Sequence, residues 1–106
     1  MAARNINAKE YQELILKDTP VLVDFWAPWC GYCRRIGPAV DKLAAAREDV
    51  QIVKINIDEE PALAAQERIE VIPTLVLYRS GYELGSIVAP ESKARIEEFL
   101  EESLKQ

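Results

Sequence analysis

The chain has 106 residues, 49% of them hydrophobic and 29% charged, which suits one soluble domain spanning residues 1–106. Its formal net charge of −5, with acidic residues at 58–60 and along 97–102, argues against a nucleic-acid partner. No apolar stretch approaches the roughly 20 residues that span a bilayer, and no apolar signal segment follows the first residues. We therefore expect a cytoplasmic monomer that does not associate with membranes.

Helices and strands alternate in the first half of the predicted structure. Asn7 suits the cap of a helix that runs to about Lys17. Val21–Ala27 is a nearly continuous apolar run, which is typical of a strand buried on both faces. A second helix is predicted to start at or just after Cys30, and Pro38 should kink it because proline lacks a backbone N–H.

The second half predicts a similar alternation that ends in a hairpin. The expected elements are strands at 51–57, 74–78 and 84–88, a helix from Pro61 to about Arg68, a turn at Ser80-Gly81 and a last helix capped by Ser92. A short strand near residues 3–6 completes the list. The pattern predicts an α/β fold, with a central mixed sheet of four to five strands flanked by four helices and an antiparallel edge.

The two cysteines, Cys30 and Cys33, stand at the predicted junction between the buried strand and the second helix. Chemistry collects at the carboxyl ends of strands in open α/β sheets. Unpaired N–H groups and the helix dipole stabilise an anion at a helix N-terminus, so Cys30 should have a lowered pKa and act as a nucleophile. Cys33, one turn later, would then resolve the mixed disulfide.

Three other uses of this cysteine pair stay open. A structural disulfide across so short a loop would add only about 2 kcal/mol through loop entropy. A zinc site needs about four ligands, and a chain without histidine would need two carboxylates or a second chain. Two cysteines acting as small hydrophobic residues would leave the flanking Trp29 and Gly31 unexplained. A redox pair without a metal is therefore favoured.

The stretch Val21–Cys33, VLVDFWAPWCGYC, resembles the active-site segment of the thioredoxin family. KINID at 54–58, IPTL at 72–75 and Gly81 match in family order and spacing, over roughly residues 5 to 104. The resemblance implies the thioredoxin fold and a protein disulfide reductase, with an exposed Cys30, a buried Cys33 and no cofactor besides their disulfide. The implied partners are disulfide-containing target proteins and a thioredoxin reductase, which could be an NADPH flavoprotein, a ferredoxin flavoprotein or an iron–sulfur enzyme.

The resemblance also assigns roles to residues outside the cysteine pair. Asp24 sits in a buried strand, where a carboxylate is costly unless it is paired or protonated. By similarity it accepts the proton of Cys33 through a water, with Lys54 as its charge partner. The Ile72–Pro73 bond is expected to be cis and to face the cysteines. A flat apolar docking surface is implied around Cys30, consisting of Trp29, Gly31, Val71, Ile72, Val88 and Ala89, with Tyr32 and Pro73 as further substrate-binding candidates.

The chain departs from the family pattern at three places. Val71 stands where a small residue is common, and Ala89-Pro90 replaces a glycine-alanine pair, so the bulkier surface is expected to change the choice of targets. Tyr32 stands where proline is common. Its backbone N–H could point at the Cys30 sulfur, favour the thiolate and make the protein a stronger oxidant. The alternative is that Tyr32 is only an exposed ring at the edge of the motif.

Two other functions compete with that of a thioredoxin-type reductase. One is a more oxidising exchanger of the glutaredoxin or isomerase type. Asp24, Lys54 and the Trp-Cys-Gly pattern favour thioredoxin over glutaredoxin, and the lack of a signal segment argues against an isomerase of an oxidising compartment. The other is a redox-idle binding subunit with the same fold, whose activity would survive alkylation of Cys30.

Overall fold

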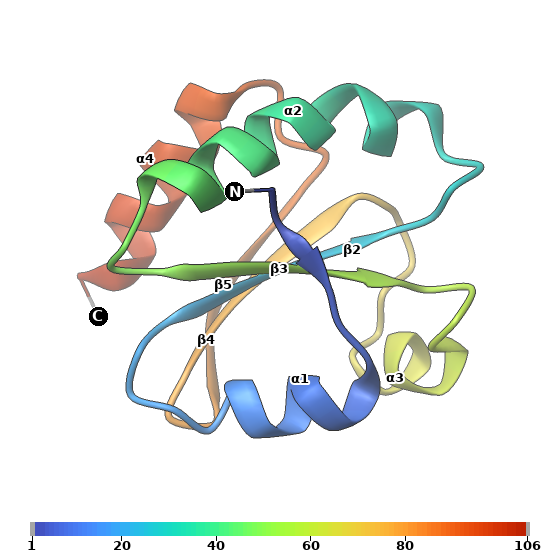
Figure 1. Ribbon diagram of the computed structural model, residues 1–106, viewed down its shortest axis with the longest axis horizontal. Helices are drawn as coiled ribbons and strands as arrows, with labels where there is room; N and C mark the ends of the chain where they lie inside the picture. Colours follow the sequence, from blue (N-terminus) through green and yellow to red (C-terminus); the bar gives the residue numbers. More distant parts are fainter. Residues whose placement is uncertain (1, 106) are drawn as a thin grey trace.

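A five-stranded mixed sheet runs through the computed structural model, which describes residues 2–105 (Figure 1). The strand order is β1-β3-β2-β4-β5, so the strand that leads to the cysteines, β2, is central. Along the chain the elements are β1 (Arg4–Asn5), α1 (Ala8–Leu14), β2 (Val21–Trp26), α2 (Gly31–Ala46), β3 (Gln51–Asn56), α3 (Pro61–Gln66), β4 (Thr74–Arg79), β5 (Tyr82–Val88) and α4 (Lys93–Leu104). The predicted α/β class, the four helices and the short first strand are confirmed.

The sheet combines a parallel half and an antiparallel half. Strand β3 pairs in parallel with β1 and β2, whereas β4 is antiparallel to both β2 and β5. The predicted antiparallel hairpin is confirmed, but the alternation of strands and helices also predicts parallel pairing for β4, and this is wrong, because β4 runs antiparallel to β2. Strand β4 runs opposite to β2 because the chain does not cross back after β3 and starts β4 at the end of the sheet where β2 and β3 finish. Thr74, the first residue of β4, lies in register with Phe25 near the end of β2. The loop before β4 is thereby brought to the same edge as the cysteines.

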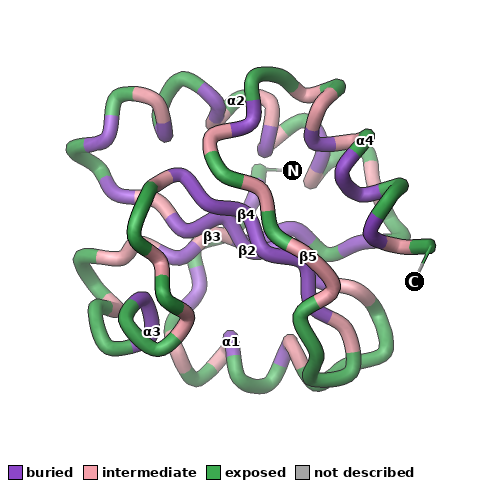
Figure 2. Tube along the Cα trace, turned by 180° about the vertical axis from the view of Figure 1, so that it is seen from behind, coloured by how far each residue is buried: buried purple, intermediate pink, exposed green. Residues whose placement is uncertain are grey.

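Helices cover both faces of the sheet, α2 and α4 on one and α1 and α3 on the other (Figure 1). Side chains alternate across the pleat, so neighbouring residues of β2 enter different cores. Leu22 packs in the core under α2 and α4, and Val21, Val23 and Phe25 pack in the core under α1 and α3. Figure 2 shows the central strands buried along most of their length, which gives the site a rigid base.

Local hydrogen bonds explain where the helices begin and end. Asn7 caps α1 as predicted, because its side chain accepts the N–H of Glu10 at 2.9 Å and its own N–H donates to Glu10 at 3.1 Å. The prediction that this helix continues to about Lys17 is wrong. The β4–β5 turn uses the carbonyls beyond α1: Ser80 donates to Lys17 O and Gly81 to Ile15 O.

The end of α3 also differs from the prediction. The helix ends at Gln66 rather than near Arg68, because Arg68 has a φ of 57°, which a right-handed helix does not accommodate. Within residues 2–105, no helix is long and apolar enough to cross a bilayer.

Candidate active site

The cysteine pair occupies the first turn of α2, directly after the central strand. Cys30 is the N-cap residue, and its Sγ accepts the backbone N–H of Cys33 at 3.1 Å. The two Cα atoms are 5.3 Å apart and the sulfurs are joined in a disulfide. A sulfur at this position meets an unpaired amide and the positive end of the helix dipole, and both stabilise a thiolate once the disulfide is reduced.

Both cysteines are shielded in this disulfide form. Cys30 is 9% exposed and Cys33 4%, so the expectation of an exposed Cys30 is wrong for this state, although Cys30 is still the more accessible of the two. The side chains packed around the pair are those of Trp26, Tyr32, Ile57 and Ile72. Packing of these side chains against the cluster that contains the two cysteines explains why Cys30 is less exposed than expected.

The loop before β4 faces the cysteines as the family resemblance implied. The Ile72–Pro73 peptide bond is cis, and Ile72 O lies 3.8 Å from Cys30 Sγ. The carbonyl of Pro73 accepts the N–H of Ala89 at 2.8 Å, which joins this loop to the one after β5. Pro73 itself is buried, and Ile72 and Ala89 are half-buried. Residues from three distant parts of the chain therefore meet beside Cys30.

The apolar part of the docking surface is open to solvent. Trp29, Val71 and Val88 are 66%, 55% and 53% exposed, among the few large hydrophobic side chains that are. The indole N–H of Trp29 donates to Asp58 at 3.0 Å, which holds the ring in place. Gly31 is also exposed, and a Cβ built there would meet nothing within 4 Å. The backbone at Gly31 is therefore open to a partner chain, with no side chain in the way.

Asp24 lies in the core behind this surface, with a carboxylate that is poorly satisfied. Its side chain is 1% exposed, and Oδ1 has no hydrogen-bond partner. Burial raises the pKa of Asp24 to about 7; the charge of Lys54 opposes this shift and that of Asp41 adds to it. A carboxyl with such a pKa exchanges its proton near neutral pH, which suits a proton acceptor.

Lys54 is adjacent to Asp24 in the sheet but is not its direct ion-pair partner. The two residues are in register across β2 and β3. Among the ion pairs within residues 2–105 none joins them; the ammonium of Lys54 lies 4.6 Å from the centroid of the Trp26 ring instead. The expected charge partnership is thus a longer-range attraction, because a cation–π contact holds the end of the lysine side chain.

Tyr32 makes a contact that the sequence did not reveal. The hydrogen bond that reaches Cys30 Sγ within the described residues comes from the amide of Cys33, not from that of Tyr32. The hydroxyl of Tyr32 donates to Pro90 O at 3.0 Å, and its ring is half-buried. The alternative of a merely exposed ring is therefore wrong, and the backbone role first expected for Tyr32 has no support here.

Sequence reasoning missed three residues of the site. Asp58 holds Trp29, Asp41 raises the pKa of Asp24, and Pro90 accepts the Tyr32 hydroxyl bond. Asp58 ends the KINID motif, so that motif carried a usable signal. Pro90 and Asp41 carried none, because their roles depend on which side chain a neighbouring element brings within reach.

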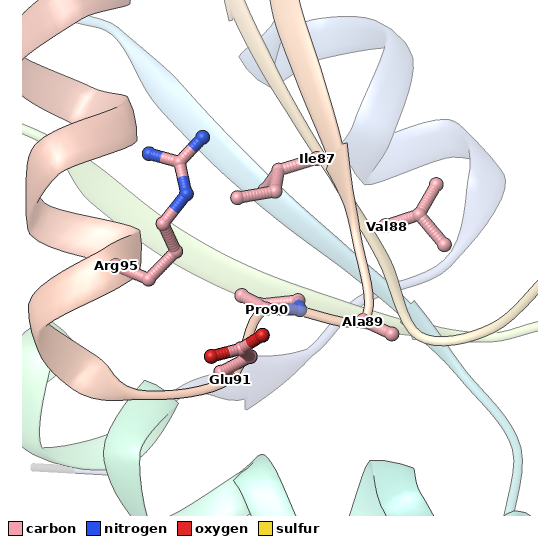
Figure 3. Close-up of a pocket in the computed structure, with 6 residues that line it drawn as sticks. All are labelled: Ile87, Val88, Ala89, Pro90, Glu91 and Arg95. Atoms are coloured by element: carbon pink, nitrogen blue, oxygen red, sulfur yellow. The ribbon is translucent and has the colours of Figure 1, made fainter.

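The end of β5 and the loop after it border a shallow hollow next to the first turn of α4. Figure 3 shows Ile87 and Val88 pointing to opposite sides of the chain, with Pro90 between them and α4. The hollow has a volume of about 340 Å³ and is lined by Ile87, Val88, Ala89, Pro90, Glu91 and Arg95. Ala89 has a φ of 45°, in the left-handed region that glycine tolerates best. This loop therefore contains one strained residue, Ala89, and one buried residue, Pro90, and it lines a hollow beside α4.

In the part of the chain from residue 2 to 105, no group of three or more histidine, cysteine or acidic side chains could hold a metal ion. The redox-active group present is the Cys30–Cys33 disulfide.

Comparison with known proteins identifies similar chains over almost the whole length. The family model described as Thioredoxin matches residues 2–102. The chain is 41% identical over 104 residues to thioredoxin 1 of Nostoc sp., with 97% of both chains covered, and 46% identical over 90 residues to the thioredoxin of Porphyra purpurea, with 84% of each covered.

Solved structures agree with these sequence matches. The oxidised mitochondrial thioredoxin 3 of Saccharomyces cerevisiae superposes with a TM-score of 0.83 at 31% identity, covering 94% of each chain. A mutant thioredoxin from Halobacterium salinarum reaches 0.87 at 29% identity, covering 96% of this chain and 90% of the other.

Replacing Asp24 by asparagine should change how stability depends on pH. The unfolded chain loses the Asp24 proton near pH 4 and the folded chain near pH 7, so the free energy of unfolding falls as the pH rises between these values. The asparagine of the Asp24→Asn variant cannot ionise, so the free energy of unfolding of this variant does not fall in that pH range. We expect it to be about 2 to 4 kcal/mol more stable than the parent at about pH 8, and similar at about pH 4.

Guanidinium unfolding of the oxidised protein at several pH values measures this difference. Asp49→Asn serves as a control, because Asp49 is exposed and Arg47 lowers its pKa, so its loss should slightly destabilise the protein at neutral pH. Identical pH profiles for Asp24→Asn and the parent would contradict the raised pKa of Asp24.

Replacing Ala89 by glycine should stabilise the protein by about 0.5 to 1 kcal/mol, because glycine adopts a positive φ without the steric cost of a Cβ. The same change at the exposed Ala94, in the first turn of α4, should have the opposite sign. Thermal and chemical unfolding measure both, and a loss of stability in Ala89→Gly would show that the strain is absent.

Proposed function

This chain belongs to the thioredoxin family of thiol–disulfide oxidoreductases, and we propose that Cys30 is its attacking thiolate and Cys33 its resolving thiol. The N-cap position of Cys30 and the N–H bond from Cys33 to its sulfur are the observations that carry this assignment. Cys30 is also the sulfur beside Ile72 O and the less buried of the two. A target sulfur therefore approaches Cys30 first.

The reaction transfers two electrons from the dithiol to the target disulfide. The Cys30 thiolate attacks one target sulfur, the target S–S bond breaks, and the first target thiolate leaves. The Cys33 thiol then gives its proton to the Asp24 carboxylate, through a water, and attacks Cys30 Sγ. The mixed disulfide breaks, the second target thiolate leaves, and the Cys30–Cys33 disulfide forms.

The docking surface supports a proposal for the class of partner. Its exposed apolar side chains, Trp29, Val71 and Val88, surround a cysteine whose neighbour Ile72 offers backbone groups, so an extended protein segment with a disulfide suits it. We propose disulfide-containing proteins as targets and a thioredoxin reductase as the electron donor. The cytoplasmic location and the monomeric state stay predictions from the sequence.

Single cysteine variants test the two roles. Cys33→Ser should accumulate a mixed disulfide between Cys30 and a target protein, because the resolving thiol is missing, whereas Cys30→Ser should accumulate far less. Non-reducing electrophoresis and mass spectrometry of the reduced variants with an oxidised target measure this. A stable adduct through Cys33 in the Cys30→Ser variant, at the level of the other, would reverse the assignment.

Asp24→Asn tests the proton acceptor. Insulin reduction at neutral pH should slow about a hundredfold, the low end of general-base contributions, while the fold gains stability. The mixed disulfide should live longer in this variant, because the resolving step is the one that loses its base. Turnover equal to that of the parent would remove Asp24 from the mechanism, and Asp49→Asn provides a matched surface control.

A further inference from the structure

We propose that the hydroxyl of Tyr32 is a positioning group for protein substrates: it holds the loop after β5 in the shape that a target chain meets. The inference rests on the proposed function and names a residue for the recognition part of that function. It assigns to Tyr32 a role in docking, separate from the exchange of electrons at the two sulfurs.

Two hydrogen bonds tie the loop after β5 to the rest of the site. The hydroxyl of Tyr32 donates to Pro90 O at 3.0 Å, a contact between residues 58 positions apart. The N–H of Ala89 donates to Pro73 O at 2.8 Å. One bond therefore joins the loop to the first turn of α2, and the other joins it to the segment that contains Ile72. The first turn of α2, the loop before β4 and the loop after β5 are therefore connected by hydrogen bonds.

The loop depends on these bonds because it lies at an edge of the sheet and contains a strained residue. It follows β5, an edge strand that pairs only with β4 among the described strands. Ala89 has a φ of 45°, which is unfavourable for a residue with a Cβ. The hollow of about 340 Å³ lies behind the loop, between it and the first turn of α4 (Figure 3). Because the loop contains a strained residue and follows an edge strand, a single neutral hydrogen bond to the buried Pro90 contributes substantially to holding it in place.

The position of the loop matters for a protein substrate more than for a small one. Val88, 53% exposed, and Ala89 belong to the docking surface, so a target segment that covers this surface contacts them. If the loop is ordered only part of the time, the apparent affinity falls by the fraction of molecules that are competent to bind. A small disulfide needs only to reach Cys30 Sγ, whose donor is the amide of Cys33 and not any group of Tyr32.

Tyr32→Phe tests this role, because it removes the hydroxyl and keeps the ring and the backbone N–H. We expect KM for insulin to rise about three- to tenfold with kcat little changed, the range of one neutral hydrogen bond. The ratio of kcat/KM for insulin to that for a small aromatic disulfide should fall by a similar factor. Tyr82→Phe is the matched control, because Tyr82 is 74% exposed in the β4–β5 hairpin. Loss of the Tyr82 hydroxyl should leave the ratio of the two kcat/KM values unchanged.

Two further measurements separate docking from other roles of the hydroxyl. Hydrogen exchange at the Ala89 amide should be faster in Tyr32→Phe than in the parent, because the loop that carries its bond to Pro73 O opens more often. The redox potential should stay the same. Unchanged exchange at Ala89, an unchanged KM for insulin, or a shifted potential would each overturn the proposal.

The proposed function fails separately from this inference. If the parent protein reduced neither insulin nor the small disulfide, the reductase assignment would fall, whatever Tyr32 does. If the parent reduced both and Tyr32→Phe slowed both by the same factor, the assignment would stand and the docking role of Tyr32 would fall.

Discussion

The hydrogen bond from the Cys33 amide to Cys30 Sγ is the interaction on which the rest of the site depends. It exists because a central strand ends next to a helix start and leaves Cys30 as the N-cap residue. In other helices of this chain, Asn7 and Ser92 satisfy the corresponding amide with oxygen. In α2 a sulfur caps the helix in place of an oxygen, and the helix N-terminus in turn stabilises the anionic form of that sulfur. The same geometry thus serves folding and reactivity.

Around this cap, the site has two parts: a base of buried strands, and a rim of segments that surround Cys30 at the surface. Strands β2 and β4 are almost wholly buried, and they hold Cys30 and Asp24 in fixed positions. The rim consists of the first turn of α2, the loop before β4 and the loop after β5, which are joined by the Tyr32–Pro90 and Ala89–Pro73 hydrogen bonds. The three positions at which the resemblance implied a departure from the family pattern, Tyr32, Val71 and Ala89, all lie in this rim. Variation in partner choice can therefore occur without disturbance of the sulfur chemistry.

The sequence predicted the elements of the fold well because its periodic patterns are strong. The apolar run at 21–27, the caps at Asn7 and Ser92 and the CxxC spacing each depend on local chemistry, and each was confirmed. Helix ends were less predictable, because α1 stops where a distant turn uses its carbonyls. The side-chain ends were least predictable: Lys54 reaches Trp26 rather than Asp24, and Tyr32 reaches Pro90. Such choices are made by tertiary packing, which leaves no local pattern.

The low exposure of the disulfide has a consequence for how fast the protein exchanges electrons with small thiols in solution. With Cys30 only 9% exposed and Cys33 4%, free small thiols reach the bond slowly. A protein that docks on the rim can bring its sulfur next to Cys30, the more exposed of the two cysteines. We therefore expect electrons to enter and leave mainly through docked proteins rather than through small thiols in solution. The oxidation state of the chain can then differ from that of the thiols dissolved around it.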